Sequence, residues 1–513
     1  MAEKTKKKQK IQRPKPRNYK GFRDVFSADI LLRQRMIDST RAIFERYGFS
    51  PLETPALEYV DCLGKFLPEE HTPEGGIFSF RNPDLADGTR PDHPDWWLGL
   101  RYDLTAPLAR VVAQYQDLPK PFRRYQLGQV WRYEKPGPGR FREFYQFDFD
   151  TVGAPSMIAD AESCAMMCDV IEALGFTAGD YVIQVNDRKA LQGALECAGL
   201  TETDITDERS QVGVALRAID KLDRIGRNGV TELLGKGRTD ASGDYTAGAG
   251  LDDKQIAVIH DYLDARSESR TEVCDCLAEL VADSTIGCEG VDELRQIDRF
   301  LTDLGYGPER VRFEPTVVRG LGYYTGPVFE GIITREIVDE KGKRSDFGSV
   351  AAGGRYDTLV QRFTGQKTPA VGASIGIDRL LAAMRLLEGN EVTACTTEVL
   401  ITVMDKSRIT DYLQLLKQVR EAGINSEVFV GSGSIGKQLQ YADRRGIPLA
   451  VIAGSDEFDN GEYQVKDLEL GRRLAADIEK REEWLADRPS QQSVSADMLI
   501  ATLKDTLAGY RKA

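Results

Sequence analysis

The chain has 513 residues, of which 41% are hydrophobic and 29% are charged, a composition typical of a globular protein with several domains. Its formal net charge of −13 excludes a general positive field that would hold nucleic acid, so any RNA contact must come from local basic patches. The sequence also lacks the run of about 18 apolar residues that a membrane span requires. We therefore expect a cytoplasmic protein.

Few side chains are suited to histidine- or cysteine-based chemistry. The eight cysteines are scattered and have no Cys or His partner at metal-ligand spacing, so reduced and mostly buried thiols are expected. The three histidines, His71, His93 and His260, lie in no recognisable catalytic triad. Any chemistry should therefore depend on arginines, carboxylates and the positioning of substrates.

Residues 1–21 form a basic tail, and the first twenty of them hold nine Lys or Arg against one acid. The tail lacks the apolar segment of a secretory signal. Its composition predicts disorder. Two roles remain open for it, as a solubilising segment or as an auxiliary contact to RNA phosphates.

Residues 22–189 read as the first part of a mixed domain. Helical periodicity begins at Ser27 and stops at Gly48. Two strand-like runs flank the Pro-Gly-Pro-Gly turn at 136–139, which predicts an antiparallel hairpin. Further helices are predicted at 101–112 and 160–174.

The second strand of this hairpin alternates between two kinds of side chain, as a half-buried strand does. One face carries Phe141, Glu143, Tyr145, Phe147 and Phe149, and the other carries Arg140, Arg142, Phe144, Gln146, Asp148 and Asp150. A face with two arginines, an amide and two carboxylates makes a poor core. It makes a good floor for a polar ligand.

The rest of the chain divides into segments that differ in composition and in predicted secondary structure. Residues 190–305 are charged and rich in helical pattern, which predicts an inserted helical domain. Strands return in 306–393. Residues 396–485 alternate strand and helix, which predicts a separate α/β domain with parallel strands. Residues 486–513 read as an extension made of a polar linker and a short amphipathic helix.

The sequence has no phosphate-binding loop of the GxxxxGK[ST] type and no GxGxxG after a strand. If ATP is used, side chains must hold its phosphates, and arginine suits this role because its planar fork meets phosphate oxygens in pairs. The candidates lie beside strands or turns, at Arg132, Arg140, Arg142, Arg319 and Arg379.

Several segments together resemble one family. WRYEKPGPGRFREFYQFDFD is similar to motif 2 of class II aminoacyl-tRNA synthetases, in the form seen in histidyl-tRNA synthetases. GFSPLETPALE resembles motif 1, with its proline at Pro55, and GASIGIDRL resembles motif 3, with its arginine at Arg379. VVRGLGYYTGPVFE and AAGGRYD resemble the two signatures of the histidine enzymes. The C-terminal stretch GKQLQYADRRGIPLAVIAGSDEFDNGEYQVKDL resembles their anticodon-binding domain. The resemblance covers about 22–190 and 306–480.

This resemblance implies an α+β fold, in which helices flank the antiparallel sheet of a class II synthetase, with a helical insertion and a C-terminal α/β anticodon-binding domain. The implied activity is that of a histidine–tRNA ligase. L-histidine would react with ATP, helped by Mg²⁺, to give histidyl-adenylate and pyrophosphate, and histidine would then pass to the 3′ end of tRNA(His). Motif 1 implies a homodimer. The resemblance does not assign the Mg²⁺ ligands.

Carried over residue by residue, the resemblance also implies a site. Its catalytic residues are Arg319 and Arg132, with Arg319 placed against the α-phosphate and the carboxylate of histidine. ATP would be held by Arg132, Glu134, Arg140, Phe144 and Arg379, with Phe144 on the adenine, Glu134 on its amine and Arg140 and Arg379 on the γ-phosphate. Histidine would be held by Asp103, Leu104, Thr105, Arg132, Gln146, Asp150, Arg319, Tyr323 and Tyr324, with Asp150 and the tyrosines on the imidazole.

Three other readings remain open from the sequence. One is a regulatory subunit of an ATP phosphoribosyltransferase, which keeps the synthetase core without its catalysis. Another is a class II synthetase for a different amino acid, and the third is an RNA-binding or signalling module. Taken alone, Tyr323 and Tyr324 could be ordinary aromatics of a sheet, and Gly353 and Gly354 could mark a bulge. The chain also departs from many members of the family at Gly322, where they carry Asp.

Overall fold

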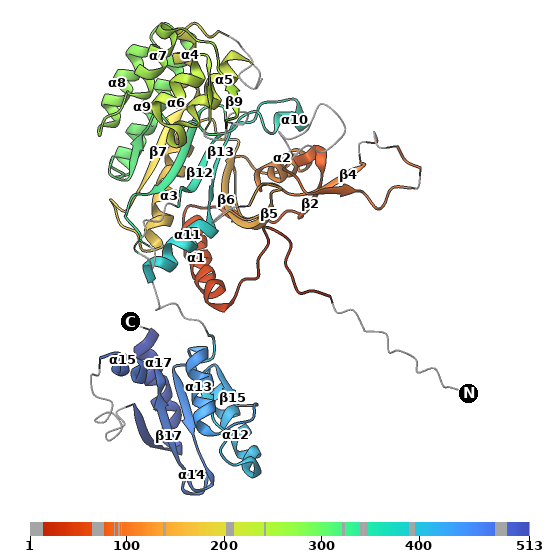
Figure 1. Cartoon of the computed structure of the whole chain (residues 1–513), viewed down its shortest axis with the longest axis vertical. Helices are drawn as coiled ribbons and strands as arrows, with labels where there is room; N and C mark the ends of the chain where they lie inside the picture. Colours follow the sequence, from red (N-terminus) through yellow and green to blue (C-terminus); the bar gives the residue numbers. More distant parts are fainter. Residues whose placement is uncertain are drawn as a thin grey trace. The chain divides into compact units, whose positions relative to one another are not determined.

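The computed structural model describes residues 14–63, 76–86, 88–90, 93, 95–136, 140–201, 210–240, 243–320, 324–338, 342, 347–388, 395–477 and 490–511. The chain divides into two compact units (Figure 1). The first comprises Met1–Asp24 and Arg35–Leu387, and the second comprises Val25–Gln34 and Glu388–Ala513. Within the described part of the chain, no helix has both the length and the apolar character that crossing a membrane requires.

The first unit is built on an eight-stranded sheet whose centre is antiparallel, as the sequence predicts. Only the two edge pairings, β1 with β5 and β10 with β7, are parallel. In spatial order the strands are β1 (Ser50–Pro51), β5 (Phe122–Trp131), β6 (Glu143–Val152), β13 (Ala370–Ile375), β12 (Ser349–Arg355), β11 (Pro327–Ile333), β7 (Tyr181–Asp187) and β10 (Val311–Phe313).

The predicted hairpin is the pair β5 and β6, which stays in register from Phe122 opposite Val152 to Trp131 opposite Glu143. The alternation of β6 separates its two faces as expected. Phe147 and Phe149 are fully buried, and their rings lie 4.9 and 5.2 Å from the ring of Phe44 in helix α1 (Ser27–Arg46). The polar residues of β6 therefore face away from this aromatic core.

Helices and a small sheet complete the first unit around these strands (Figure 1). Helix α2 begins at Thr105 rather than near 101, because the Asp103 carboxylate accepts the backbone N–H groups of Thr105 and Ala106. The remaining elements are α2 (Thr105–Gln114), α3 (Ile158–Ala173), α10 (Gln361–Thr364), α11 (Ile377–Glu388), the 3-10 helix η1 (Val60–Leu63) and the three-stranded sheet of β2 (Leu57–Tyr59), β4 (Trp97–Leu100) and β3 (Ser79–Arg81).

The segment between β7 and β10 is mostly helical and belongs to the same compact unit as the large sheet. Helices α4 and α9 pack closely at two glycines, since a Cβ atom on Gly193 would lie 2.3 Å from the Cα atom of Gly287. The elements are α4 (Arg188–Cys197), α5 (Gln211–Ile219), α6 (Leu222–Leu234), β8 (Gly237–Thr239), β9 (Tyr245–Ala247), α7 (Asp253–Leu263), α8 (Arg270–Leu280) and α9 (Thr285–Asp303).

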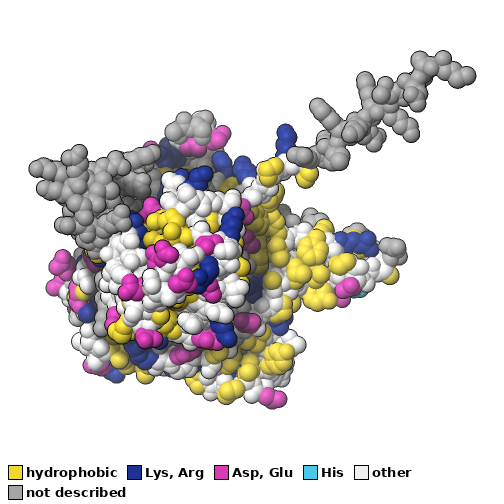
Figure 2. Space-filling model, turned by 90° about the horizontal axis from the view of Figure 1, so that it is seen from below, with side chains coloured by type: hydrophobic (Ala, Val, Ile, Leu, Met, Phe, Trp, Pro, Cys, Tyr) yellow, Lys and Arg dark blue, Asp and Glu magenta, His cyan; other side chains and the backbone are white. Residues whose placement is uncertain are grey.

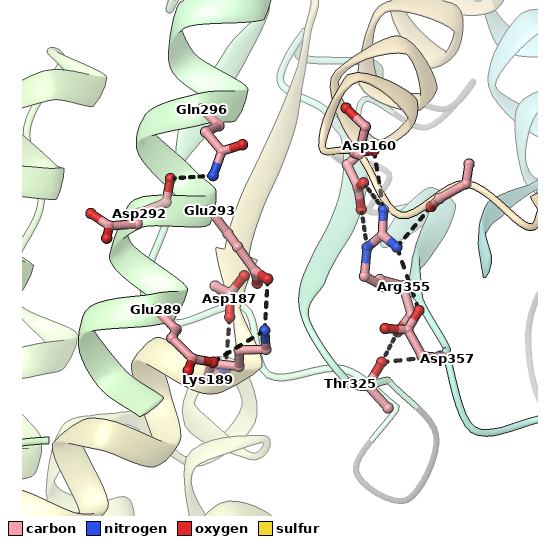
Figure 3. Close-up of polar contacts among 12 residues, drawn as sticks. Asp160, Asp187, Lys189, Glu289, Asp292, Glu293, Gln296, Thr325, Arg355 and Asp357 are labelled. Carbon is pink, nitrogen blue, oxygen red and sulfur yellow. Dashed lines mark hydrogen bonds and ion pairs between the residues drawn. The ribbon is translucent and has the colours of Figure 1, made fainter. Parts of the chain in front are cut away.

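Two ion pairs, of which the first is buried, hold the Gly-rich strand β12 and this helical segment in place (Figure 3). Arg355, at the end of β12, pairs with Asp160 of α3, and both side chains are at most 3% exposed. Lys189 of α4 lies 2.6 Å from Glu293 of α9. The arginine of the AAGGRYD segment is therefore a structural residue that anchors β12 to α3.

The second unit contains the predicted parallel strands β15 (Ser426–Val428), β14 (Val399–Ile401) and β16 (Leu449–Ile452). Two antiparallel strands extend this sheet, β17 (Glu462–Asp467) and β18 (Gln491–Ser495), which the sequence analysis did not foresee. The helices are η3 (Lys406–Arg408), α12 (Ile409–Glu421), α13 (Ile435–Arg445), α14 (Ser455–Asn460), α15 (Leu468–Asp477) and α17 (Ala496–Arg511).

The C-terminal residues are an integral part of this second unit. We expected 486–513 to be an extension beyond the α/β domain. Instead β18 pairs with β17, and Leu499, Leu503 and Leu507 of α17 lie in the same buried cluster as Val399 of β14. The described residues of this stretch therefore supply one wall of the core.

The expectation of a disordered tail over 1–21 also needs correction at its end. Residues 1–13 lie outside the described part. Closer to the domain, the Gly21 carbonyl accepts the backbone N–H of Arg142 at 2.9 Å, and the Tyr19 hydroxyl accepts from the Arg142 guanidinium at 3.1 Å. The residues just before 22 are thus packed against strand β6 and its hairpin.

Substituting Asp160 with alanine should destabilise the first unit strongly. The buried Arg355 guanidinium would lose its fully buried acidic partner and keep Asp357, at 3.4 Å. Breaking a buried pair costs about 3–5 kcal/mol. Chemical denaturation of the purified protein measures this loss. Asp275→Ala, which breaks the exposed pair with Arg295, is the matched control and should cost less than about 1 kcal/mol. Equal small losses in both variants would contradict the anchoring role of Arg355.

Candidate active site

A cavity of about 280 Å³ lies on the polar face of the large sheet. Seven residues named from the sequence line it together, although they come from segments far apart in the chain: Asp103, Thr105, Arg132, Gln146, Asp150, Arg319 and Tyr324. The remaining lining residues are Tyr102, Asp148, Gly320, Ala352, Tyr356, Gly372, Ala373 and Ser374.

One end of the floor is a fixed carboxylate, Asp150, whose side chain is 3% exposed. Arg124 of β5 lies 2.6 Å from its Oδ2 atom, and the Tyr356 hydroxyl donates to its Oδ1 atom. Gly372 of β13 leaves room for this arrangement, because a Cβ atom there would lie 2.2 Å from Asp150 Oδ1. Asp150 is therefore held in one orientation from three sides.

Beside it the floor offers hydrogen-bond acceptors without partners. The Gln146 side chain donates to Ser374 Oγ at 2.9 Å, which leaves Gln146 Oε1 buried and unpaired within the described structure. Asp148 Oδ1 is likewise buried and unpaired within the described structure. Burial raises the pKa of Asp148 to about 7, although the nearby Arg124 opposes that shift. Unpaired buried acceptors are costly, so this floor is suited to a ligand that brings hydrogen-bond donors.

The loop before α2 supports the floor in two ways. The Asp103 carboxylate caps the helix, with Oδ1 lying 3.1 and 2.9 Å from the backbone nitrogens of Thr105 and Ala106. Leu104 is completely buried, and its carbonyl oxygen accepts from Arg124 at 3.1 Å. Leu104 thus contributes its backbone to the support of Arg124, whereas its side chain is absent from the cavity lining.

The hairpin places the ATP candidates next to one another. The guanidinium of Arg132 lies 4.3 Å from the ring of Tyr102 and 5.1 Å from the ring of Phe144. Glu134 accepts from the Tyr102 hydroxyl at 2.8 Å and pairs with Arg140.

Among the hairpin residues that are candidates for binding ATP, only Arg132 lines the cavity itself. Arg142, another candidate phosphate ligand, instead lies 4.5 Å from the ring of Tyr133 and donates to the Tyr19 hydroxyl. It is therefore engaged in packing.

Two further arginines approach from the other half of the sheet. Arg319 makes a two-point pair with Glu330 of β11, with Nε at 2.9 Å from the carboxylate. Burial lowers the pKa of Arg319. Arg379, near the start of α11, donates to the Ser349 carbonyl at 2.5 Å. Tyr324 lines the cavity, and burial raises its pKa. Its neighbour Tyr323, also expected here, lies outside the described residues.

Four polar residues at or beneath the floor were not assigned a role from the sequence. For each of them the sequence contains a feature that partly indicates its position. Asp148 stands on the polar face of the alternating strand, and Tyr356 and Ser374 lie inside the AAGGRYD and GASIGIDRL segments. Arg124 gave the weakest signal, because it belongs to the partner strand and only the pairing of β5 with β6 sets it opposite Asp150.

The antiparallel sheet, the polar floor and the arginines of the hairpin and of α11 together define a class II aminoacyl-tRNA synthetase. Comparison with known sequences supports this class. The family described as histidyl-tRNA synthetase matches residues 21–380, and the family described as anticodon binding domain matches residues 398–504. The chain belongs to the histidyl-tRNA synthetase family, and it is an aminoacyl-tRNA ligase for histidine.

Individual relatives agree over nearly the whole length. A histidine–tRNA ligase of Cereibacter sphaeroides is 51% identical over 500 residues, which cover 97% of this chain and 99% of the relative. One of Dinoroseobacter shibae is 50% identical over 505 residues, which cover 98% and 99%. Among solved structures, the histidyl-tRNA synthetase from Nostoc sp. PCC 7120 is similar with a TM-score of 0.72 at 29% identity, covering 97% of this chain and all of that one. These matches favour the ligase over the other readings of the sequence.

We expect histidine binding to depend on pH, because the pKa of Asp148 is raised. An ionised carboxylate attracts a bound ammonium group more strongly than the neutral acid does, and the ionised fraction of Asp148 falls about tenfold between pH 8 and pH 6 for a pKa of about 7. The KM for histidine of the native protein should rise accordingly as the pH falls.

Histidine itself titrates in this range, so the matched comparison is Asp148→Asn, for which the change in the substrate is the same. We expect the native KM to rise about tenfold more than that of the variant, measured by pyrophosphate exchange at both pH values. Parallel profiles for the two proteins would remove Asp148 from histidine binding.

Proposed function

We propose that the described cavity binds L-histidine on the floor of the sheet and ATP along the hairpin, and that it forms histidyl-adenylate. One observation carries this proposal. Gln146 and Asp148 present buried, unpaired acceptors to the same cavity that Arg132 and Arg319 line with positive charge. Histidine has donors at its ammonium and imidazole groups and a negative carboxylate, so both kinds of group find partners.

For histidine, Asp103, Thr105 and Gln146 would surround the α-amino group, with Leu104 holding the loop through its backbone. Asp150, together with Tyr323 and Tyr324, would recognise the imidazole. The support given to Asp150 by Arg124 and Tyr356 favours this role, because a carboxylate that is already oriented loses little entropy when a ligand binds. Sites that hydrogen-bond a substrate group reject analogues that lack it.

For ATP, Phe144 would stack on the adenine and Glu134 would accept from its exocyclic amine. Arg132 would bind the α-phosphate, and Arg140 and Arg379 the γ-phosphate. Glu134 and Arg140 pair with each other in the described structure, so ATP would replace this pair with contacts of its own. Arginine retains its charge during such an exchange.

The activation step would then be an in-line displacement. An oxygen of the histidine carboxylate forms a bond to the α-phosphorus while the bond from that phosphorus to the bridging oxygen of pyrophosphate breaks. Negative charge builds on the phosphorus oxygens, and Arg132 and Arg319 would stabilise it. Glu330 holds the Arg319 guanidinium at two points and so fixes its direction. The step therefore uses a fixed arginine and no histidine side chain.

Magnesium would support this step by neutralising phosphate charge. The described residues contain no group of three or more His, Cys, Asp or Glu side chains arranged to hold a metal ion. A Mg²⁺ ion bound to ATP needs only one or two carboxylates besides the phosphates. Glu330, the carboxylate beside Arg319, would supply one of them.

In the transfer step, the terminal ribose hydroxyl of tRNA(His) would attack the histidyl carbonyl carbon, and AMP would leave with the bonding electron pair. The match of residues 398–504 to an anticodon-binding domain supports recognition of the tRNA by the second unit. We place the reaction in the cytoplasm, because all eight cysteines are free thiols, as a reducing compartment favours.

We also infer a homodimer formed through the segment that resembles motif 1. A groove of about 730 Å³ beside this segment is lined by both apolar and polar side chains. The apolar ones include Leu52, Pro55, Leu57 and Tyr59, and the polar ones are Glu53, Glu58, Arg110 and Gln114. Leu57 and Tyr59 are 43% and 42% exposed, and Tyr115 is 55% exposed. Figure 2 shows hydrophobic side chains gathered on the lobe that carries the small sheet. Exposed apolar patches of this kind mark interfaces between proteins.

Substituting Arg319 with alanine should reduce histidine-dependent pyrophosphate exchange by at least about 10²–10³-fold, the usual effect of removing one donor to transition-state charge. The melting temperature should fall only modestly, since the Arg319 side chain is 40% exposed and the partner that it leaves, Glu330, is 13% exposed. Arg335→Ala, which removes an exposed arginine paired with Asp180, serves as the control and should keep full activity. Near-native exchange by a folded Arg319→Ala protein would refute the assigned role.

A further inference from the structure

The segment Asn18–Asp24, just before the first helix, forms a clasp on the motif 2 hairpin. The Tyr19 ring lies 5.5 Å from the ring of Phe22 and 6.4 Å from that of Phe78. Gly21 adopts φ +88°, and a Cβ atom there would lie 2.8 Å from Cγ of Arg142. The clasp therefore needs glycine at this position, both for its backbone angle and for its close approach to Arg142.

One side chain of the clasp reaches across to the motif 3 helix. Arg23 Nη2 lies 2.6 Å from Asp378 Oδ1, and the Arg23 guanidinium stacks 3.8 Å above the ring of Phe141. The other oxygen of Asp378 accepts the backbone N–H of Tyr145 at 2.9 Å. The Asp378 side chain is 11% exposed, whereas the Arg23 side chain is 37% exposed, so only the acidic partner is shielded from solvent. Arg23 thus connects strand β6 with the start of α11.

The residues that Arg23 holds are the direct neighbours of two proposed ATP ligands. Phe141 follows Arg140 in the chain, and Asp378 precedes Arg379. The Arg140 side chain is 64% exposed, and a long exposed side chain loses much conformational freedom when it binds a ligand. The position of the Arg140 backbone therefore determines how closely its guanidinium approaches the γ-phosphate, which Arg379 is also proposed to bind.

We propose that Arg23 is a positioning residue for ATP, which sets the spacing between the arginines of motif 2 and motif 3 by holding Phe141 and Asp378 together. This inference rests on the proposed roles of Arg140 and Arg379. Arg23 itself touches neither substrate. Its stacking on Phe141 and its ion pair with Asp378 pre-organise the two arginines, so ATP binds without having to bring them into place.

Pyrophosphate exchange with the full-length chain tests this role. Arg23→Gln should raise the KM for ATP about tenfold and leave the KM for histidine within about twofold. Among the described residues, the clasp contacts Phe78, Phe141, Arg142 and Asp378, none of which belongs to the histidine floor. Arg23→Lys keeps the ion pair but loses the flat stacking group, so it should restore part of the affinity for ATP. Arg295→Gln, at an exposed pair on α9, is the matched control and should leave both constants unchanged.

Four outcomes separate the possibilities. An unchanged KM for ATP in a folded Arg23→Gln protein would overturn the inference, and so would equal losses for ATP and histidine together with a lower melting temperature. Arg379→Ala, measured in parallel, tests the underlying assignment. If it leaves the KM for ATP unchanged, the proposed role of Arg379 fails. If it raises this KM and Arg23→Gln does not, only the inference on Arg23 fails.

Discussion

The floor of the candidate active site depends on one buried cation, Arg124, which is completely inaccessible to solvent. Its guanidinium lies 2.6 Å from Asp150 and its charge acts on Asp148 as well. Two carboxylates this deeply buried would be too costly to keep ionised without a compensating charge. The pairing of β5 with β6 supplies that charge, because Arg124 stands directly opposite Asp150.

The same constraint explains the small residues of the neighbouring strand. In β13, Gly372 stands opposite Asp150 and Ser374 opposite Asp148. A larger residue at Gly372 would displace the carboxylate that Arg124 holds, and the Ser374 hydroxyl accepts from Gln146. The segments that resemble motifs 2 and 3 are therefore complementary to each other in shape, quite apart from the arginines with which each would bind ATP.

Local patterns in the sequence were enough to predict the elements whose identity depends on near neighbours. The alternation from 140 to 150 correctly separated the aromatic core from the polar floor, and the β-α-β-α-β pattern correctly predicted parallel strands in the second unit. Class and family followed from the order of several motifs. Asp148 was placed on the correct face, but its unpaired oxygen is visible only once the neighbouring strands are in place.

Features that depend on contacts between distant segments could not be predicted in this way. The register of the hairpin brings Arg124 beneath the floor, although the arginine itself stands in an unremarkable strand. Strand β18 and the apolar face of α17 acquire their partners only from β17 and β14, so 486–513 looked like an extension. Likewise the composition of the tail predicted disorder up to 21, while the contacts of Tyr19 and Gly21 come from Arg142, more than a hundred residues later.

The central claim is that the carboxylate fixed by Arg124 and Tyr356 selects the imidazole of histidine. Asp150→Asn tests it most directly, because the amide has almost the same shape but lacks the charge. The variant must first be shown to be folded by thermal unfolding, since the buried Arg124 loses its counter-ion. Pyrophosphate exchange should show a KM for histidine raised at least about tenfold, equivalent to about 1.4 kcal/mol, with the KM for ATP nearly unchanged. A raised KM for ATP together with an unchanged KM for histidine would contradict this account.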